Sequence, residues 1–256
     1  MTIALTRSPG PELAQCELTF VERAPIEYER ALEQHASYRA ALKELGAEVV
    51  NLPALSGAPD ATFVEDPALV LDDIALLTRP GAESRLAEGA SLGEALSAWR
   101  SLEAMEAPGT LDGGDVLRIG DVLYVGQSSR TDHAGLKQLA HRVLPHGLRV
   151  KAVHVEGSLH LKTACTWLGG NTLLVNPGWV DTERLDGYEL LEIDPSEPFA
   201  ANVLRIGGGV VIAASAARTA ERVEALGIKV IQVDLSEFEK AEGGPTCLSL
   251  LVEPCP

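Results

Sequence analysis

The sequence has 256 residues, of which 46% are hydrophobic, and a formal net charge of −16 at pH 7. This charge excludes the phosphate backbone of nucleic acids and anionic membrane surfaces as expected partners. The chain lacks both a signal peptide pattern and the roughly 18 continuous apolar residues of a membrane span, so we expect a soluble, cytoplasmic protein. Because no Pro/Ser-rich linker divides it, residues 1–256 are predicted to form one domain.

The N-terminal part of the chain predicts a strand, a helix and a second strand. Residues 1–8 (MTIALTRS) form an apolar run, residues 28–46 have helical spacing, and residues 47–53 (AEVVNLP) form another apolar run. Four later segments each predict a β-hairpin, because two apolar runs flank a turn of Gly or Asp. They are residues 67–81, 115–127, 164–178 and 202–215.

Helices and third strands follow some of these hairpins. Helical spacing at 133–144 precedes a strand at 148–155, and helical spacing at 217–227 precedes a strand at 228–234. The repeating unit is therefore ββαβ, about fifty residues long. Residues 246–253 (TCLSLLVE) supply only a first strand, and the N-terminal segment supplies the rest of that unit. The sequence thus predicts an α/β fold, a pseudo-five-fold propeller that the two chain ends close together.

Residues with catalytic chemistry precede the first strand of four units. They are Glu65 and Asp66, then Asp112 and Asp115, then His160, and finally Cys247. Equivalent positions of a radial repeat converge at one end of its axis, so we expect these groups to lie together. A thiol, an imidazole and several carboxylates are suited to nucleophilic catalysis, with a base near the nucleophile and an acid orienting the base.

A structural interpretation competes with this one. A lone cysteine beside an apolar strand is more often a small core residue, and we keep that interpretation for Cys16, Cys165 and Cys255. Only the shared repeat position favours a functional interpretation of His160 and Cys247. The histidines lack the close ligand spacing of a structural zinc site, so no metal is expected.

Six segments, taken together, closely resemble the dimethylargininases, also called dimethylarginine dimethylaminohydrolases. They are FVED (63–66), RPGAESR (79–85), TLDGGDVL (110–117), SSRT (128–131), LHLKTAC (159–165) and EGGPTC (242–247). The resemblance extends through nearly the whole chain. It implies the pseudo-five-fold α/β propeller of the guanidino-group modifying superfamily. It also implies hydrolysis of asymmetric dimethylarginine and monomethylarginine to citrulline through a covalent cysteine intermediate, with no cofactor.

The resemblance further implies roles for individual residues. Cys247 is expected to be the nucleophile, His160 the general acid/base, and Asp112 the acid that orients the histidine. Some relatives have Glu at the position of Asp112, so the sequence leaves open whether the shorter side chain contacts His160 directly. The substrate-binding residues that the resemblance implies are Leu18, Asp60, Glu65, Asp66, Arg85, Arg130 and Glu242. Among these, Glu65 and Asp66 would face the guanidinium, and Arg85 and Arg130 the α-carboxylate.

Two alternatives from other classes are weaker. An arginine deiminase or amidinotransferase uses related chemistry, but arginine deiminases carry an added helical region for which this compact chain has no room. A binding protein on the same scaffold, such as a ribosomal anti-association factor, would not need these groups in repeat phase, and a charge of −16 suits an RNA-rich partner poorly. The sequence indicates neither the preferred methylarginine nor the oligomeric state, and a homodimer is compatible with it.

Overall fold

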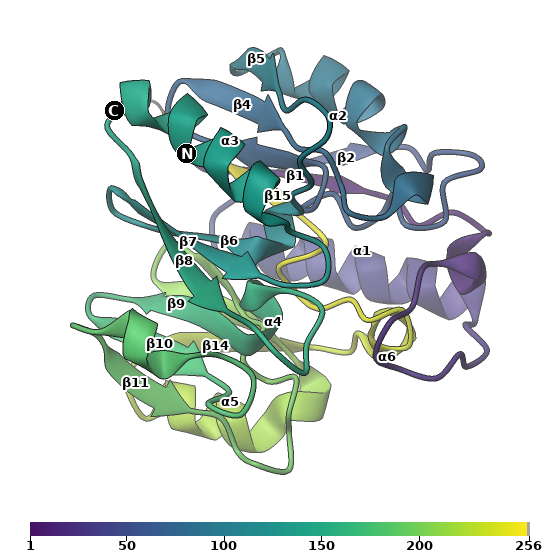
Figure 1. Ribbon diagram of the computed structural model, residues 1–256. Coiled ribbons are helices and arrows are strands. Elements are labelled where there is room, and N and C mark those ends of the chain that lie inside the picture. The colour runs from purple at the N-terminus through teal and green to yellow at the C-terminus, as the bar shows by residue number, and fades with distance from the viewer. Residues whose placement is uncertain (255–256) are drawn as a thin grey trace.

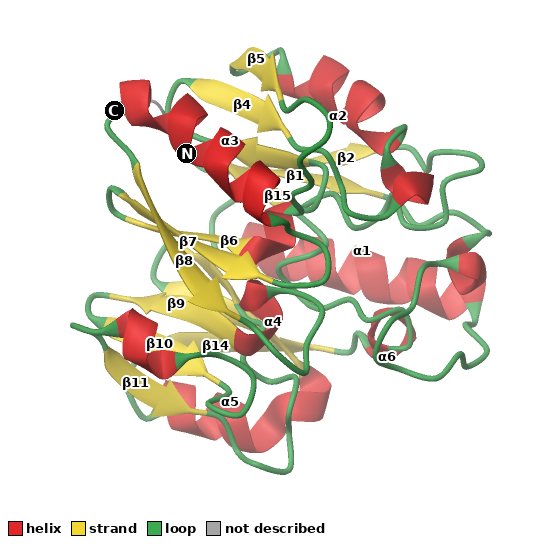
Figure 2. Ribbon diagram, in the orientation of Figure 1, coloured by secondary structure: helices red, strands yellow, loops and turns green. Residues whose placement is uncertain are grey.

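The structure, a computed structural model, describes residues 1–254 as five small sheets of three strands each, with helices on the outside (Figure 1, Figure 2). The first sheet contains β15 (Leu250–Val252), β1 (Ile3–Arg7) and β2 (Glu48–Leu52). The others contain β3 (Ala68–Val70), β4 (Ile74–Leu77) and β5 (Ser101–Ala104); β6 (Val116–Ile119), β7 (Val122–Gln127) and β8 (Arg149–His154); β9 (Cys165–Gly169), β10 (Thr172–Val175) and β11 (Glu189–Glu192); and β12 (Leu204–Ile206), β13 (Gly209–Ala213) and β14 (Lys229–Val233).

Each sheet repeats one pattern of strand pairing. The middle strand pairs antiparallel with the first strand and parallel with the third, as where Val125 of β7 lies opposite Val116 and Val122 opposite Arg149. Parallel neighbours need a crossover connection, and α3 (His133–Val143) supplies it between β7 and β8. The hairpins expected at 67–81, 115–127, 164–178 and 202–215 are all present.

The two ends of the described chain share one sheet. β15 pairs antiparallel with β1, so that Ile3 lies opposite Val252 and Leu5 opposite Leu250. β1 then pairs parallel with β2 through the crossover helix α1 (Tyr28–Glu44). The last strand therefore takes the place that the first hairpin strand occupies in the other sheets, as the sequence predicted.

The helices differ in length from unit to unit. α2 (Glu88–Leu96) and α5 (Ala217–Glu224) connect strands as α1 and α3 do, whereas α4 (Leu161–Ala164) and α6 (Ser236–Glu239) are single turns. Between β10 and β11 there is only a 3-10 helix, Thr182–Leu185. That connection is short and begins with Asn-Pro-Gly, which favours a turn over a helix. The ββαβ unit therefore loses its α-helix there.

Buried apolar side chains form five clusters instead of one central core. Under α1, Tyr38 and Leu42 pack with Phe238, and under α3, Leu139 packs with Leu123. A repeat unit of this size buries its apolar face against its neighbours, so each sheet depends on the next for stability.

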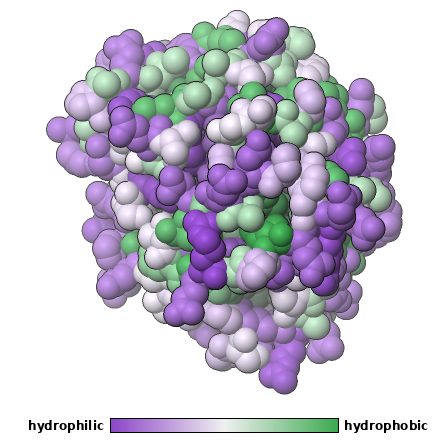
Figure 3. All heavy atoms as spheres, turned by 90° about the vertical axis from the view of Figure 1, so that its right-hand side faces the viewer, coloured by the Kyte–Doolittle hydropathy of each residue, from purple (hydrophilic) through white to green (hydrophobic). Residues whose placement is uncertain are grey.

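One face of the molecule is mainly polar (Figure 3). The face drawn in Figure 3 is mostly hydrophilic, with small hydrophobic groups scattered over it. Large hydrophobic side chains that are exposed include Phe20 and Phe199, each with 47% of its surface accessible. Such isolated exposure is normal for a folded domain. No helix within residues 1–254 is long and apolar enough to cross a membrane.

Candidate active site

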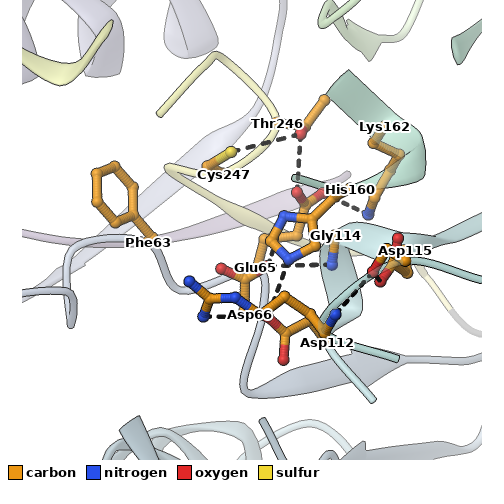
Figure 4. A network of polar contacts seen from close by, with 12 residues as sticks. Phe63, Glu65, Asp66, Asp112, Gly114, Asp115, His160, Lys162, Thr246 and Cys247 are labelled. Carbon is orange, nitrogen blue, oxygen red and sulfur yellow. Dashed lines mark hydrogen bonds and ion pairs between the residues drawn. The ribbon is translucent and has the colours of Figure 1, made fainter. Parts of the chain in front are cut away.

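Hydrogen bonds link the five units to one another at or just before their first strands. The bonds join Gly113 N–H to the Asp66 carbonyl (2.8 Å), Leu161 N–H to the Asp115 carboxylate (2.9 Å), the Thr166 hydroxyl to the Ala201 carbonyl (2.6 Å), Thr246 N–H to the Asn202 side chain (3.0 Å) and Glu65 N–H to the Cys247 carbonyl (3.3 Å). Each bond joins two neighbouring units. The polar segments of all five units are therefore fixed against one another, and most of the predicted site residues lie there (Figure 4).

Cys247 lies in a tight turn before β15. Its N–H bonds the Gly244 carbonyl (3.1 Å), and Gly244 N–H donates back to Sγ (3.5 Å). Glycine is required in this loop because a Cβ on Gly243 would lie 2.3 Å from the Phe63 ring, which packs against the backbone. The loop that the sequence placed before the last strand thus holds the thiol in a fixed position.

His160 is bound directly by Asp112. Its Nε2 lies 2.9 Å from Oδ2 of Asp112, and its Nδ1 lies 3.8 Å from Oδ1 of Asp66. The Asp112 carboxylate is itself oriented by Gly81 N–H, which donates to Oδ1 at 2.8 Å. The contact that the sequence left open is therefore present. An aspartate reaches the imidazole because its backbone lies close to the ring.

Carboxylates keep the buried imidazole protonated. Burial alone would lower the pKa of His160, but the charges of Asp66, Asp115 and Asp112 and the hydrogen bond that the imidazolium donates to Asp112 raise it to about 9. For Asp66, burial would raise the pKa, but the charges of His160 and Arg85 lower it to about 2. At neutral pH the site therefore contains an imidazolium between two carboxylates, and the imidazolium can donate a proton.

The thiol has the opposite electrostatic environment. Burial and the charges of Glu65 and Asp66 raise the pKa of Cys247 to about 12. The group is therefore a neutral thiol at neutral pH in the free protein. A cation placed beside it would favour the thiolate, since opposite charge stabilises the ionised form.

The two adjacent carboxylates at 65 and 66 face different surroundings. Asp66 lines a small cavity together with His160 and Cys247. Glu65 does not line that cavity: its Oε1 pairs with the Lys162 ammonium (2.5 Å) and its Oε2 accepts a bond from the Thr246 hydroxyl (2.7 Å). Figure 4 shows this chain from Lys162 to Thr246 beside Cys247. Glu65 is therefore already bonded through both oxygens, and one of its partners, Thr246, is the neighbour of Cys247 in the chain.

The cavity brings most of the predicted residues together. It is lined by Glu17, Asp60, Phe63, Asp66, Arg85, Arg130, Leu159, His160, Ala241, Glu242, Gly243 and Cys247. Asp112 does not line the cavity, because it lies behind the imidazole. Leu18 and Glu65 do not line the cavity either. The cavity volume is about 20 Å³, which is room for a single water molecule. An amino acid can enter only after part of the wall moves.

The segment 17–21 closes over this cavity. The Glu242 carboxylate accepts bonds from the N–H groups of Thr19 (3.0 Å), Phe20 and Val21 (2.7 Å), and the Asp60 carboxylate accepts one from Glu17 N–H (3.2 Å). Leu18, between these anchors, packs against the apolar cluster under α1. Two predicted substrate-binding acids thus hold the covering segment through its own backbone.

The two predicted arginines are buried and paired with acids of the site. Arg85 bonds Asp66 at 2.5 Å on one side and Glu88 at 2.8 Å on the other. Arg130 lies 4.0 Å from Asp112 and donates to the Thr19 hydroxyl at 3.4 Å. Both arginines line the cavity. From this position they can bind a negatively charged group of a ligand if they give up some of their contacts with the acids and with Thr19.

The other two described cysteines do not line the cavity. Cys16 and Cys165 are free thiols that are buried in apolar clusters, and burial raises the pKa of Cys165 to about 12 with no charged neighbour involved. Cys255 lies outside the described residues. Cys247 alone of the three described thiols lines the cavity with a histidine.

Asp66, Asp112 and His160 place one potential metal-ligand atom each within 4.8 Å of the others. Arg85 bonds Asp66, and the imidazole bonds Asp112, so in this structure the three act as a proton and charge network. The expectation that the site needs no metal stays a prediction.

Several residues of the site were not singled out from the sequence. Three of them lie inside the family motifs: Lys162 in LHLKTAC, Thr246 in EGGPTC and Phe63 in FVED. Each is close in the chain to a residue that the sequence did single out, and this proximity could have identified them. Asn202, whose side chain bonds Thr246 N–H, begins the fourth hairpin segment, at the same place in its unit as the other site residues.

Comparison with known proteins identifies the family of the chain. The chain is 44% identical to N(G),N(G)-dimethylarginine dimethylaminohydrolase of Streptomyces coelicolor over 248 residues, covering 96% of this chain and 95% of the relative. It is 37% identical to the enzyme of the same name from Pseudomonas aeruginosa, covering 96% and 97%. The chain belongs to the dimethylarginine dimethylaminohydrolase family. This confirms the resemblance of the sequence motifs. A family model described as arginine deiminase also matches residues 93–198.

Solved structures of dimethylarginine dimethylaminohydrolases superimpose on nearly the whole chain. A cysteine-to-serine mutant of the Pseudomonas aeruginosa enzyme, complexed with citrulline, gives a TM-score of 0.91 at 35% identity and covers 97% of this chain and 98% of its own. A histidine-to-glycine mutant of a dimethylarginine dimethylaminohydrolase, an adduct with S-methyl-L-thiocitrulline, gives 0.94 at 36% identity and covers 98% and 100%. The α/β fold of five small sheets is therefore that of this family.

Proposed function

We propose that this member of the family hydrolyses Nω-methylated arginines to citrulline and methylamine or dimethylamine through a covalent bond to Cys247. The observation that carries the proposal is that Cys247 and His160 line one cavity with Asp66, while Asp112 fixes the imidazole from behind. The citrulline complex and the S-methyl-L-thiocitrulline adduct of the related enzymes support this product and a covalent intermediate.

Binding begins with movement of the segment around Leu18, because the closed cavity is too small for an amino acid. Arg85 and Arg130 then receive the α-carboxylate of the substrate, while Asp60 and Glu242 exchange backbone N–H donors for groups of the ligand. Asp66 accepts guanidinium N–H bonds and holds the planar group over Sγ of Cys247. We assign Glu65 to the floor of the site, where it fixes Thr246, because both of its oxygens are occupied.

Two displacements at the guanidinium carbon complete the reaction. As the thiol loses its proton to solvent, the Cys247 sulfur attacks and a tetrahedral adduct forms. The His160 imidazolium gives its proton to the departing amine, which leaves an S-alkylthiouronium on Cys247. Neutral His160 then accepts a proton from an attacking water. Collapse of the second adduct breaks the C–S bond, passes the remaining hydroxyl proton to the departing sulfur, releases citrulline and regenerates the thiol and the imidazolium. This scheme uses no cofactor.

The charges of the site explain why the substrate takes part in activation. In the free protein the carboxylates oppose a thiolate, and the pKa of Cys247 is raised to about 12. A bound guanidinium brings a positive charge next to the sulfur and lowers that pKa. The nucleophile therefore forms mainly when a substrate is present to react with it.

The test is citrulline release from asymmetric dimethylarginine, monomethylarginine, symmetric dimethylarginine and arginine at one pH. We expect kcat/KM for the first two to exceed that for arginine by tenfold or more. Arginine would bring extra N–H donors to the side of the leaving group, and an unpaired buried donor costs roughly 1–3 kcal/mol. Equal or faster release from arginine would overturn the proposal in favour of arginine deiminase, the activity named by the family model that matches residues 93–198.

We further propose that residues 1–256 act as one catalytic domain in which the five sheets surround a pseudo-five-fold axis. The hydrogen bonds between neighbouring units, and the sheet shared by β1 and β15, support this closure. We place the enzyme in the cytoplasm, since the free thiols of Cys16, Cys165 and Cys247 suit a reducing compartment. A homodimer stays a prediction.

A further inference from the structure

Four of the five units contribute a residue with evident chemistry in front of their first strand, and the remaining one contributes an amide. Glu65 and Asp66 precede β3, Asp112 precedes β6, His160 precedes β9 and Cys247 precedes β15. At the corresponding place before β12 is Asn202, two residues ahead of the strand. Its side chain is buried, with an accessible fraction of 5%. The repeat therefore directs this amide to the end of the molecule that holds the site.

Asn202 contacts the nucleophile loop at three points. Its Oδ1 accepts a hydrogen bond from Thr246 N–H (3.0 Å), and its Nδ2 donates toward Sγ of Cys247 (3.9 Å). Its amide plane also lies against Gly244, where an added Cβ would come within 2.6 Å of the amide carbon. Because the Thr246 donor requires an oxygen at Oδ1, the orientation of the amide is determined and the nitrogen must face the sulfur.

Few other groups can donate to the sulfur. Gly244 N–H is 3.5 Å from Sγ, and the Thr246 hydroxyl is 4.0 Å away. That hydroxyl also lies 2.7 Å from Oε2 of Glu65, an acceptor that takes its only proton. Within residues 1–254, Gly244 N–H and the Asn202 amide are therefore the donors left for a negatively charged sulfur.

We propose that Asn202 is a positioning residue for the reaction, which holds the Cys247 loop through Thr246 and turns its N–H donor toward the thiolate as that charge develops. This inference rests on the proposed function, in which Cys247 is the nucleophile. The acidic surroundings of the thiol make such a donor valuable, since Glu65 and Asp66 raise the pKa of Cys247. Hydrogen bonds to charged groups are the stronger ones and contract as the charge forms.

The substitution Asn202→Asp separates the two parts of this role. Aspartate has nearly the same shape and keeps an oxygen for Thr246 N–H, but it replaces the donor near Sγ by an acceptor with a negative charge. Asn202→Ala removes both bonds. If Asn202 only supports the loop, the Asp variant performs at least as well as the Ala variant. If donation to the sulfur matters, the Asp variant is the worse of the two.

The experiment compares wild type, Asn202→Asp, Asn202→Ala and the control Asn176→Ala. Asn176 is the matched control because its side chain bonds the Pro198 carbonyl and does not reach the site. For each protein, the rate of Cys247 alkylation by iodoacetamide is measured at several pH values below the thiol midpoint, and kcat and KM are measured with asymmetric dimethylarginine. Thermal unfolding shows that the variants are folded.

We expect Asn202→Ala to lower both the alkylation rate and kcat by roughly ten- to a hundredfold, with KM changed by less than about threefold. Asn202→Asp should lose more than Ala in both measurements, and Asn176→Ala should match wild type. Alkylation at the wild-type rate in Asn202→Asp, or a loss confined to KM, overturns the proposal. Alkylation needs no substrate, so it tests the role of Asn202 even if wild type releases no citrulline. Absence of citrulline release would count against the proposed function alone.

Discussion

Oδ2 of Asp112 lies 2.9 Å from Nε2 of His160, and Asp112 has no accessible surface in the structure. The carboxylate is thus a fixed, dry partner that favours the protonated imidazole. Asp112→Asn should lower the pKa of His160 from its value of about 9, because a charged partner is replaced by a neutral one. General acid catalysis is present below that pKa and is lost as the pH rises through it. The basic limb of the kcat profile should therefore move to lower pH in the variant.

The same substitution should lower kcat by roughly 10²-fold or more, the scale of a lost acid–base contribution. Asp121→Asn is a suitable control, since Asp121 forms an exposed ion pair with Arg149. A pH profile measured from about pH 6 to about pH 10 decides the matter. An unshifted basic limb in Asp112→Asn would show that Asp112 does not tune His160.

The sequence predicted the position of some site residues but not of others. The hairpin pattern and the split fifth unit predicted that Cys247, His160 and Asp112 would meet, because equivalent positions of a repeat converge. The sequence could not specify which of two neighbouring acids faces the cavity. That choice depends on Lys162 and Thr246, which bind Glu65 on the other side and come from two different units.

Two further features could not be predicted from the sequence. The missing helix between β10 and β11 leaves only a 3-10 turn, since a short connection with Pro177 and Gly178 satisfies the crossover without a full helix. Closure of the segment 17–21 depends on backbone N–H groups of Thr19, Phe20 and Val21. Every residue except proline has a backbone N–H, so the sequence does not show which of these groups Glu242 binds.

The nucleophile itself is tested by substitution and by labelling. Cys247→Ser should abolish turnover, whereas Cys16→Ser and Cys165→Ala should retain most of it, because neither of those thiols lines the cavity with His160. Mass spectrometry of a quenched reaction should find the substrate adduct on the peptide containing Cys247. Turnover by Cys247→Ser, or an adduct on another cysteine, would refute the mechanism.

Alkylation adds a prediction about the charge state of the thiol. In the free protein the pKa of Cys247 is raised to about 12, so alkylation should still accelerate above the ordinary cysteine midpoint of about 8.5. A small unreactive guanidinium ligand that leaves the sulfur accessible should shift the curve to lower pH. A fully formed thiolate near pH 6 in the free protein would contradict activation by the substrate.

Glu242 should control the opening of the cavity. Its Oε1 accepts N–H bonds from Thr19, Phe20 and Val21, and Oε2 accepts a second one from Thr19. Glu242→Gln replaces the charged carboxylate by a neutral amide, which forms weaker hydrogen bonds and turns an NH2 group toward a backbone N–H. Hydrogen exchange at these three amides should become roughly tenfold faster in the variant, while amides of α3 stay unchanged. Glu239→Gln, which alters a neighbouring acid bonded to Ser215, is the control. Unchanged protection at residues 19–21 would mean that other contacts keep the segment closed.

The ion pair between Lys162 and Glu65 should matter more for stability than for substrate binding. Glu65 is buried and the Lys162 side chain is only 14% exposed, the Nζ–Oε1 distance is 2.5 Å, and Glu65 does not line the cavity. Lys162→Met leaves a buried carboxylate with only the Thr246 hydroxyl as partner, and breaking a buried pair on one side costs about 3–5 kcal/mol. Burial already raises the pKa of Glu65, and without the ammonium it should rise further, so Glu65 takes up a proton on folding. Because a raised carboxylate pKa favours the folded state at low pH, the variant should lose stability relative to wild type as the pH rises.

Lys162→Met combined with Glu65→Gln removes the charge and should recover most of the loss. Urea unfolding of wild type, both single variants and the double variant at two pH values gives the coupling energy directly. If the losses of the two single variants simply add in the double variant, the pair is not coupled, and the floor of the site does not depend on it.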